Sequence, residues 1–387
     1  MKYGLQDIDL LYGSTLVKDA IYNGDIVYQS LPLQITESDK TVVFDRFVDF
    51  LPQNGRFRIP FLEITNNNVL IAGTDVRHNT FGDFTIVDIG IKRSTDWGAT
   101  WLTEQIVHQN NGIDIVGTGS RKNNGTILND KNTGRVYIFA FVIDNYTDQP
   151  IGGVVINDLL WDCVYKYSDD DGATWSSEIS VKHLLSSGSN AFLPGTSNKG
   201  IVMNNGTLVV PIYEARHSGN TSEAGADWIG RSGFVYSTDS GATWQKSTLI
   251  PAPTNECSLV ESPNGTLNMF CRSYNSDRRH FYTTDIGINW QVGALDKENN
   301  GFVNQIGTHK INNTLIWHSS MSATARENLQ MFISKDFQNY TLFIDNIFPS
   351  GYYGYSCSAS KDDKFFLIYE VFTGTTLVNL SRFLNYI

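Results

Sequence analysis

Arginine side chains among strand-forming residues are the first feature of this sequence that could bind a ligand. Arg58 lies in the sequence FRIP, Arg77 ends the sequence DVR, and Arg272 and Arg326 follow much later. A guanidinium group can hold a carboxylate through two parallel, charge-assisted hydrogen bonds, which a lysine ammonium cannot reproduce. Taken alone, an arginine before a proline in a strand is more often part of a surface salt bridge. The four arginines indicate an anion site only if the fold brings them together.

Three side chains with ionisable oxygen atoms could carry acid–base and nucleophilic chemistry. Asp83 lies on a glycine-containing stretch six residues after Arg77, Glu256 lies in the sequence NECSLVE, and Tyr355 lies in the sequence GYS. A carboxyl group can donate or accept a proton, and tyrosine, with a pKa near ~10, becomes a nucleophile at neutral pH only beside a base. Alone, Asp83 would be an ordinary turn residue.

Each candidate has a neighbour of the same chemical type. Glu256 and Glu261 would face opposite sides of a sheet, because they are five apart on one strand. Glu256 fits the motif of the family resemblance described below, and we interpret Glu261 as structural. Arg278 and Arg279 are interpreted as solvated charges. The remaining competitors are Asp88 for the acid, and Tyr352 and Tyr353 for the nucleophile.

The other reactive residue types add little. His78, beside Arg77, is interpreted as structural, and the sequence has no zinc motif and no glycine-rich phosphate loop. We therefore expect no cofactor and no metal ion. The cysteines have no metal-ligand spacing and are expected to be buried free thiols; they are Cys163, Cys257, Cys271 and Cys357.

A repeated eight-residue pattern indicates which elements position these residues. Within it, an Asp can hydrogen-bond to its own backbone, a Gly two residues later accepts a positive φ, and a closing Trp anchors the turn in the core. The Asp therefore closes the turn, which is a simpler interpretation than calcium binding. Such turns repeated along the chain predict a radial or stacked array of sheets. The copies are 94–101 (STDWGATW), 168–175 (SDDDGATW), 237–244 (STDSGATW), 283–290 (TTDIGINW) and a decayed copy without Trp at 334–340.

Composition limits the partners. Asn-Gly pairs near β-rich segments predict hairpins and an all-β fold. The net charge of −11 argues against nucleic acid, and it requires any site for an anionic ligand to create its own local positive field. We find no apolar run of the roughly 20 residues needed to span a membrane, and no signal peptide in residues 1–21.

The repeat S-x-D-x-G-x-T-W is the Asp box, and with the motifs above the chain resembles the sialidase (neuraminidase) family. The resemblance covers about residues 40–387. It implies a six-bladed β-propeller with four-stranded antiparallel blades over residues 36–387. It also implies an exo-α-sialidase that releases terminal sialic acid from glycoproteins, glycolipids and oligosaccharides. The matching residues run in family order: Arg58, Arg77, Asp83, Glu256, Arg272, Arg326 and Tyr355.

The resemblance also implies a role for each matching residue. Asp83 would be the acid/base, Glu256 the base that activates Tyr355, and Arg77 a contact to the sugar O4. Because the substrate carboxylate would repel a carboxylate nucleophile, a tyrosine forms the covalent intermediate, and hydrolysis retains the configuration. The carboxylate itself would be held by Arg58, Arg272 and Arg326.

Two alternatives stay open at this point. A trans-sialidase would use the same covalent step and pass the sugar to another acceptor. A propeller that only binds glycans or receptors would need the arginines but not Asp83 together with Glu256.

The sequence departs from the family pattern near the sugar O4. Where many sialidases have Met-Asp-Pro-Thr, residues 123–126 read NNGT, so that Asn124 replaces an Asp. This puts O4 recognition and sugar preference in doubt. Trp161 is interpreted either as part of the N-acetyl pocket or as a core residue.

The first 35 residues differ from the rest. Alternation over residues 20–29 around Asn23-Gly24 predicts a hairpin, which would not be stable alone in water. The segment resembles short modules at the start of phage tail and virion proteins. We therefore expect either an attachment module for a virion or cell surface, or an extra hairpin at the propeller edge.

Overall fold

The computed structural model shows an all-β protein, as the Asn-Gly hairpins and Asp boxes predict. Within the described residues, three short 3₁₀ helices accompany the strands: η1 (Glu37–Asp39), η2 (Lys182–Leu184) and η3 (Ser381–Tyr386). None of the described helices is long and apolar enough to cross a membrane. The structure describes residues 21–22, 25–26, 35–49, 56–78, 86–110, 118–147, 161–187, 191–195, 198–217, 228–273, 278–293, 305–321, 327–345, 347, 354–371 and 374–387.

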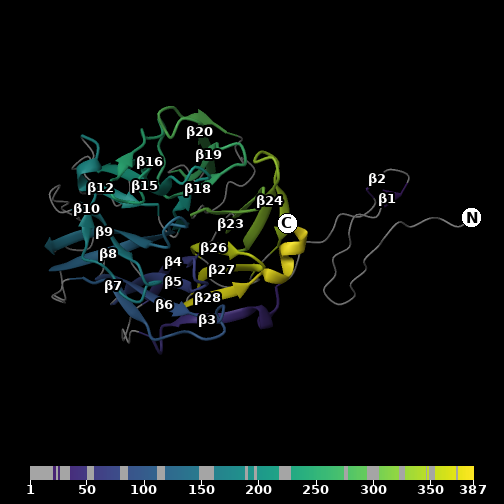
Figure 1. Ribbon diagram of the computed structural model, residues 1–387, viewed down its shortest axis with the longest axis horizontal. Helices are drawn as coiled ribbons and strands as arrows, with labels where there is room; N and C mark the ends of the chain where they lie inside the picture. Colours follow the sequence, from purple (N-terminus) through teal and green to yellow (C-terminus); the bar gives the residue numbers. More distant parts are fainter. Residues whose placement is uncertain are drawn as a thin grey trace, which may run out of the picture.

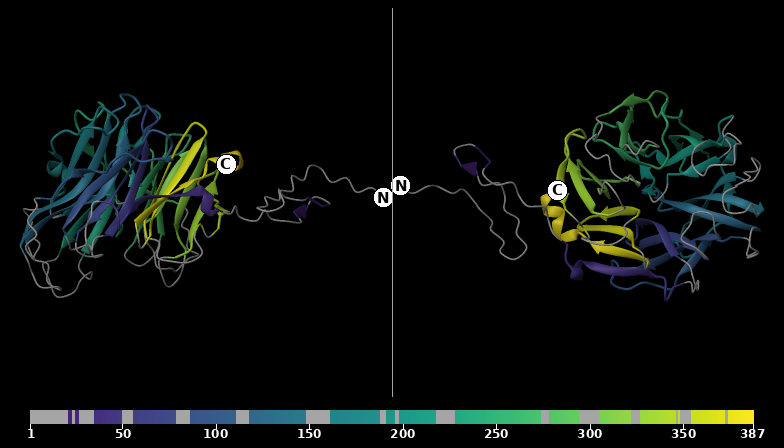
Figure 2. Two further views of the ribbon diagram at one scale, coloured as in Figure 1. Left: turned by 90° about the horizontal axis from the view of Figure 1, so that it is seen from below. Right: turned by 180° about the vertical axis from the view of Figure 1, so that it is seen from behind.

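Four sheets form separate blades in a propeller-like arrangement around a common centre (Figure 1). Antiparallel pairing dominates each blade, and Figure 2 shows the strands side on. The first blade contains β12 (Ala191–Pro194), β14 (Ile201–Val202), β15 (Leu208–His217), β16 (Trp228–Ser237) and β17 (Gln245–Lys246). The second blade contains β18 (Cys257–Glu261), β19 (Leu267–Arg272), β20 (Arg278–Thr283) and β21 (Gln291–Val292). The third blade contains β22 (Gly307–Ile311), β23 (Thr314–Ser320), β24 (Leu329–Ser334) and β25 (Thr341–Ile344).

The fourth blade joins the two ends of the propeller chain. Its inner strands come from the C-terminal part: β26 (Ser356–Lys361), β27 (Lys364–Val371) and β28 (Gly374–Asn379). The outer strand, β3 (Lys40–Asp45), comes from the N-terminal part and pairs with β28 antiparallel. Because one blade needs both ends, the ring of sheets is closed by backbone hydrogen bonds.

A nine-stranded sheet occupies the remaining part of the ring. Two antiparallel runs within it are connected through one parallel pair, Val87↔Arg121. The runs are β4 (Arg56–Ile64), β5 (Leu70–Arg77), β6 (Val87–Ser94) and β7 (Gln105–His108), then β8 (Thr118–Asn129), β9 (Val136–Thr147), β10 (Trp161–Ser168) and β11 (Ile179–Ser180), with β13 (Asn198–Lys199) beside β8.

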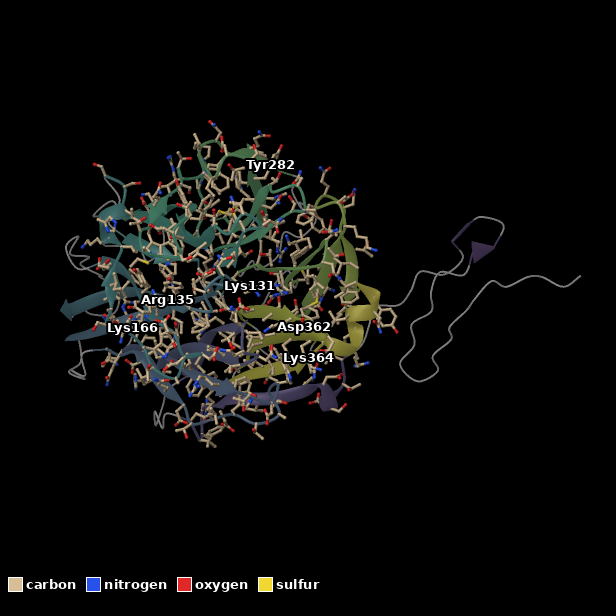
Figure 3. The ribbon with its side chains drawn as sticks, viewed as in Figure 1. Lys131, Arg135, Lys166, Tyr282, Asp362 and Lys364 are labelled. Carbon is tan, nitrogen blue, oxygen red and sulfur yellow. The ribbon has the colours of Figure 1, made fainter. Side chains whose placement is uncertain are left out.

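The core lies between neighbouring sheets, and Figure 3 shows the side chains on the ribbon. Phe44, Phe57, Phe366 and Leu377 belong to one buried cluster and come from β3, β4, β27 and β28. Each Asp-box aromatic packs against such a cluster: Trp244, 8% exposed, is fully part of one, and Trp101, Trp175 and Trp290 lie at the edges of others. The boxes therefore attach each turn to an interface between sheets.

The Asp-box turns form as predicted. Ser94 ends β6, and its Oγ donates to Asp96 Oδ1 at 2.7 Å and accepts from Gly98 N at 2.8 Å. Thr100 N donates to the same Asp96 oxygen at 2.9 Å. The copies that begin at Ser168, Ser237 and Thr283 repeat these bonds at the ends of β10, β16 and β20. In all four, Gly has a positive φ and so does the residue before it.

The decayed fifth copy is a tighter turn. Asn339 N donates to Asp336 Oδ1 across three residues, where the intact boxes span four. Phe337 takes the positive φ of 61° and is buried, and Tyr340 packs edge-on against Trp317 at 5.9 Å between ring centroids. The fifth turn is thus shorter, and the aromatic residues Phe337 and Tyr340 stabilise it in place of the Gly and Trp of the intact boxes.

Two smaller predictions are also confirmed. The cysteines are buried and free, and burial raises the pKa of Cys357 to about 11, so that this thiol is protonated at neutral pH. Strands β1 (Ile21–Tyr22) and β2 (Asp25–Ile26) pair antiparallel, as a hairpin requires, and residues 23–24 between them lie outside the described part of the chain. Most of the first 34 residues lie outside the described part of the chain.

Candidate active site

Candidate site residues gather at one end of the strands, opposite the Asp boxes. Arg58 lies near the start of β4, and Arg77 ends β5. Arg272 ends β19, while Glu256 and Tyr355 come directly before β18 and β26. In an antiparallel sheet the start of one strand lies beside the end of the next. Residues separated by almost 300 positions in sequence therefore meet at this end.

Glu256 connects Tyr355 with Arg272. The Tyr355 hydroxyl donates to Glu256 Oε1, and Arg272 Nη1 donates to the other oxygen, Oε2, at 2.8 Å. Glu256 and Tyr355 are 8% and 4% exposed. Burial opposes the charge on Arg272, but Glu256 and Tyr355 outweigh it, so the pKa of Arg272 is raised. A carboxylate in this position can accept the phenolic proton while a permanent cation stays beside it.

The backbone at Glu256 supports this contact. Arg272 N donates to Glu256 O at 2.8 Å, and Asn255 N donates to Arg272 O at 3.0 Å. These bonds extend the ladder between β18 and β19 beyond the strand end. Glu256 and Arg272 are therefore cross-strand neighbours, which places their side chains within reach of each other.

A strained bulge in β4 sets the direction of the Arg58 side chain. Ile59 has φ 58°, and the pairing of β4 with β5 shifts between Arg58 and Phe61. A β-branched residue at positive φ is a genuine outlier that the surrounding structure must hold in place. Here the Ile59 N–H donates to Glu370 Oε2 at 2.8 Å, and Arg58 Nε and Nη2 donate to Oε1 at 3.3 Å. The Arg58 guanidinium then lies 5.4 Å from the Tyr355 ring centroid.

Glu370 is a site residue that we did not identify from the sequence. It is 1% exposed, and its backbone N–H donates to Tyr355 O at 2.9 Å. The available signal was its charge within the apolar strand KFFLIYEV of β27. The same carboxylate explains Gly354, because a Cβ there would lie only 1.4 Å from Glu370 Oε1. A larger residue at position 354 would therefore push this carboxylate away from its place beside Arg58 and Ile59.

Arg77 and Asn124 meet at the buried Asp75. Arg77 Nη2 donates to Asp75 Oδ2 at 3.2 Å, and Asn124 N donates to Oδ1 at 3.0 Å. Burial raises the pKa of Asp75 to about 7, although Arg77, Arg58 and the Asn124 N–H oppose the shift. Asn124 has φ 59° in a bulge of β8, and its side chain is buried. It thus contributes its backbone N–H here, and Arg77 is fully enclosed.

Three predicted site residues lie wholly or partly outside the residues that the structure describes. Asp83 lies outside the described residues, in the connection that leaves β5 just after Arg77 and returns at β6. Arg326 also lies outside them, in the connection from β23 to β24. Both connections leave from the same end of the sheets as Tyr355. Trp161 begins β10, and its side chain is outside the described part.

Asp88 and Glu261, the described alternatives to Asp83 and Glu256, bind other partners. Asp88 accepts from Asn110 N at 2.5 Å and lies 2.7 Å from His78 Nε2. Glu261, at the far end of β18, accepts from Asn204 N at 2.9 Å and lies 3.9 Å from Lys310 Nζ. Both carboxylates thus serve local structure. Tyr352 and Tyr353 lie outside the described residues.

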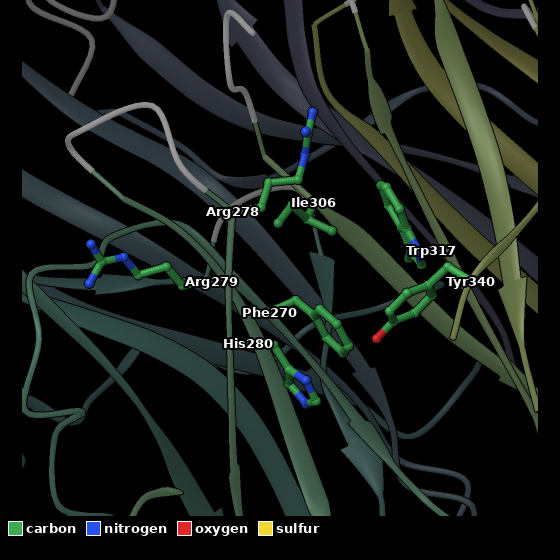
Figure 4. Close-up of a pocket in the computed structure, with 7 residues that line it drawn as sticks. All are labelled: Phe270, Arg278, Arg279, His280, Ile306, Trp317 and Tyr340. Carbon is green, nitrogen blue, oxygen red and sulfur yellow. The ribbon is translucent and has the colours of Figure 1, made fainter. Parts of the chain in front are cut away.

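The interpretation of Arg278 as a solvated charge is wrong. Its side chain is buried between two sheets, and Nη2 donates to Ser320 O at 2.7 Å at the end of β23. Arg279, next on the strand, is partly exposed, and Figure 4 shows the two arginines pointing in different directions. The alternation of a strand sends one into the interface and the other outward.

Metal binding finds no support among the described residues. They contain no group of three or more His, Cys, Asp or Glu side chains that could hold an ion. The Asp-box carboxylates instead accept hydrogen bonds within their own turns, as in Asp96 with Thr100.

Known proteins share both the sequence pattern and the fold. The family model of the BNR repeat-like domain matches residues 86–367, which is more than half of the chain. A sialidase from Paraclostridium sordellii is 28% identical over 363 residues, covering 86% of each chain.

Solved structures agree in fold. Hadza microbial sialidase Hz136 superposes with a TM-score of 0.72 at 21% identity, covering 94% of this chain and 72% of its own. The intramolecular trans-sialidase from Ruminococcus gnavus gives 0.69 at 18% identity, covering 87% and 97%. The chain belongs to the sialidase family of BNR-repeat β-propeller proteins and is a glycoside hydrolase.

Proposed function

We propose that this protein is an exo-α-sialidase that releases terminal sialic acid with retention through a covalent intermediate on Tyr355. The observation that supports this most directly is the contact of the Tyr355 hydroxyl with Glu256, whose other oxygen accepts from Arg272. A glycan-binding protein would have no use for a tyrosine paired with a buried carboxylate. The nucleophile and its base are thus already in hydrogen-bond contact.

The propeller would have six blades. Its four separate blades account for part of the ring, and the nine-stranded sheet would supply two more, β4–β7 and β8–β11, joined by Val87↔Arg121. Buried clusters between the β4 and β8 runs, and between the β8 run and the β15 blade, support this division. Residues 36–387 would form this catalytic unit.

The substrate carboxylate would bind to arginines. Arg58 lies beside the Tyr355 ring, Arg272 donates to the same Glu256 that contacts the Tyr355 hydroxyl, and Arg326 would complete the set from the β23–β24 connection. This cluster supplies the local positive field that a chain of net charge −11 needs for an anionic sugar. A guanidinium held by Glu370 or Glu256 is also fixed in direction, so little freedom is lost when the ligand binds.

The reaction would proceed in two displacements at the anomeric carbon. In the first, Glu256 takes the phenolic proton, Tyr355 Oη bonds to the anomeric carbon, and Asp83 protonates the departing glycosidic oxygen. In the second, Asp83 removes a proton from water, water oxygen replaces Tyr355 Oη, and Glu256 returns the proton to the phenolate. Two inversions restore the original configuration.

Recognition of the sugar O4 would involve Arg77 through the corner that it forms with Asp75, since the Arg77 side chain itself is fully enclosed in this structure. Asn124 replaces the family Asp there and presents its backbone N–H to Asp75 rather than an open carboxylate to the ligand. We therefore propose that contacts at O4 differ from the usual family pattern. Trp161 is retained as a candidate for the N-acetyl pocket.

Trapping tests the proposal directly. The protein should hydrolyse a fluorogenic N-acetylneuraminic acid glycoside, and NMR should show the α-anomer of the free sugar first. A fluorinated sialosyl fluoride should leave an adduct that peptide mapping places on Tyr355, and Tyr355→Phe should fold but form none. Initial β-anomer would overturn the double displacement, and a label on Tyr352 or Tyr353 would move the nucleophile. Adding lactose as acceptor separates transfer from hydrolysis.

The N-terminal segment is proposed to act outside catalysis, either as an extra hairpin at the propeller edge or in attachment to a virion or cell surface. None of the proposed site residues lies in residues 1–35, and the first strand of the closing blade begins at Lys40. A protein beginning at Leu33 should retain hydrolysis per folded molecule. A folded but inactive truncation would show that the segment completes the site.

A further inference from the structure

One blade separates the sheet of Glu256 from the sheet of Tyr355. Strand β22 contacts both β18 and β26, and Figure 1 shows β23 of the same blade between them. Glu256 comes directly before β18, and Tyr355 directly before β26. The separation of the two side chains therefore depends on how the β22–β25 blade holds β26.

His318, on β23, makes the main side-chain connection to β26. Its Nδ1 lies 2.8 Å from Ser356 Oγ, and its Nε2 lies 2.9 Å from Ser358 Oγ. Residues two apart on a strand point to the same side, so one ring holds two successive side chains of that face. The first of them, Ser356, follows Tyr355 directly. His318 is fully buried, and both serines are also buried.

The imidazole is held in one protonation state. Burial lowers the pKa of His318 to about 3, and the charge of Lys199 adds to this shift. The ring is neutral at working pH, so one nitrogen donates to a serine and the other accepts from the second serine. Gly307 makes room for the ring, since a Cβ there would lie 2.0 Å from it.

Gln305 adds a backbone connection at the same point. Ser356 N donates to Gln305 Oε1 at 3.4 Å, and Ser319 Oγ donates to Gln305 O at 3.2 Å. Arg278 on β20 reaches the end of β23, donating to Ser320 O. A continuous set of buried contacts thus runs from the blade of Glu256 to the residue after Tyr355.

We propose that His318 is a positioning residue, which fixes the start of β26 so that the Tyr355 hydroxyl meets Glu256. The inference rests on the proposed role of Tyr355 as nucleophile. Its physical basis is that small misplacements of a reacting group lower the rate steeply without abolishing binding. The hydrogen bond to Ser356 acts on Tyr355 through one peptide unit, and the hydrogen bond to Ser358 holds the same strand three residues from Tyr355, with no direct contact to the substrate.

The same strand offers a matched control. His309, on β22, is also buried, and its Nε2 lies 2.6 Å from Ser360 Oγ, five residues from Tyr355. Burial likewise lowers the pKa of His309 well below its usual value. Removing the His318 imidazole leaves the buried Ser356 and Ser358 without this partner, whereas removing the His309 imidazole affects only the half-buried Ser360. Of the two histidines, only His318 contacts the part of β26 next to the nucleophile.

The test compares His318→Asn with His309→Asn. We expect His318→Asn to lower kcat about 10- to 100-fold. Its KM, and its Kd for 2-deoxy-2,3-didehydro-N-acetylneuraminic acid, should change less than about threefold, because the arginines are untouched. His309→Asn should lose comparable thermal stability and keep kcat within about twofold. His318→Gln carries the same amide donor and acceptor as Asn but one methylene farther from the backbone, closer to the reach of the imidazole, and should recover part of kcat.

Crystal structures of the variants give a readout that needs no turnover. The Tyr355–Glu256 contact should lengthen in His318→Asn and persist in His309→Asn. Equal kcat losses in the two variants, or an unchanged contact in His318→Asn, would overturn the positioning role. Absence of turnover in the unaltered protein would instead refute the proposed sialidase activity. The Tyr355–Glu256 contact in the variant crystal structures would still test the positioning role of His318. If His318→Asn does not fold, Ser356→Ala against Ser360→Ala makes the same comparison.

Discussion

The two ends of the propeller strands differ in how their structure is held. At the Asp-box end, each turn is closed by hydrogen bonds between residues two to four positions apart, as from Ser94 to Asp96 and from Thr100 to Asp96. At the opposite end, the contacts join residues far apart in sequence: Arg58 with Glu370, and Tyr355 with Glu256. The first end repeats one local solution, whereas the second combines single residues from different sheets into one site.

This difference separates stability from chemistry. Asp-box aromatics pack into the interfaces between sheets, so their loss should weaken the whole fold. At the site end, Glu256, Arg272 and Tyr355 would face the ligand and the reacting atoms, so conservative substitutions there should mainly affect turnover. Substitutions at the Asp-box end should therefore lower the melting temperature and leave specific activity unchanged. Substitutions at the site end should lower activity and leave the melting temperature nearly unchanged.

The largest expected effect is on catalysis at Glu256. Glu256→Gln keeps the shape but cannot accept the Tyr355 proton, so kcat should fall about 10²- to 10⁴-fold. Glu261→Gln, at the far end of the same strand, is the control and should leave kcat unchanged. Steady-state kinetics on purified, folded protein measures both. Equal kcat in Glu256→Gln and the unaltered protein would remove Glu256 as the base.

A loss of stability without a loss of chemistry is expected at Trp244. This side chain packs against Phe139 at 5.1 Å and Tyr137 at 5.7 Å between ring centroids. Trp244→Ala should cost about 3 to 5 kcal/mol of unfolding free energy. Trp290→Ala should cost less, because that ring is only partly buried. Denaturant unfolding gives the free energies, and specific activity per folded molecule should stay constant; a large drop in it would place the boxes in the site.

Arg272→Lys should give a smaller effect on turnover than Glu256→Gln. Lysine keeps the charge but loses the planar fork, and a charged hydrogen bond is worth about 1.5 to 3 kcal/mol, or roughly 10- to 150-fold in kcat/KM. The control is Arg135→Lys, whose ion pair with Asp169 lies on the surface near the boxes and should matter little. Unaltered kcat/KM in Arg272→Lys would contradict its part in holding the substrate carboxylate.

The smallest expected effect is the pH dependence of one Asp box. Burial opposes ionisation of Asp170, but hydrogen bonds from Thr174 and Ser168 outweigh it and lower the pKa to about 2. Because the folded state binds this proton less readily than the unfolded state, Asp170 stabilises the fold above about pH 4, the usual pKa of Asp, and loses that contribution as the pH falls toward 2. Asp170→Asn should therefore lower Tm slightly at pH 7 and not at all near pH 2. A Tm difference independent of pH would mean that charge is not involved.

Sequence patterns with local causes could be predicted well. The Asp-box turns, the all-β class and the buried cysteines follow from residues acting on near neighbours or on water, and all were confirmed. Arg278 shows the limit of the same reasoning, because its burial depends on Ser320 in the next sheet. The decayed box forms a turn around its Asp, as predicted, but the sequence did not show that this turn spans three residues rather than four.

By itself, the sequence determined the repeated turns, since their hydrogen bonds close within four residues and need no partner elsewhere. It also identified which arginines, carboxylates and tyrosine to expect at the site through their resemblance to a family. Only the tertiary structure decided that Glu370 holds Arg58 from 312 positions away and that Gly354 makes room for that carboxylate. Only the tertiary structure brought His318 to the strand beside Tyr355. Such contacts depend on how whole sheets pack around the ring, which no local pattern specifies.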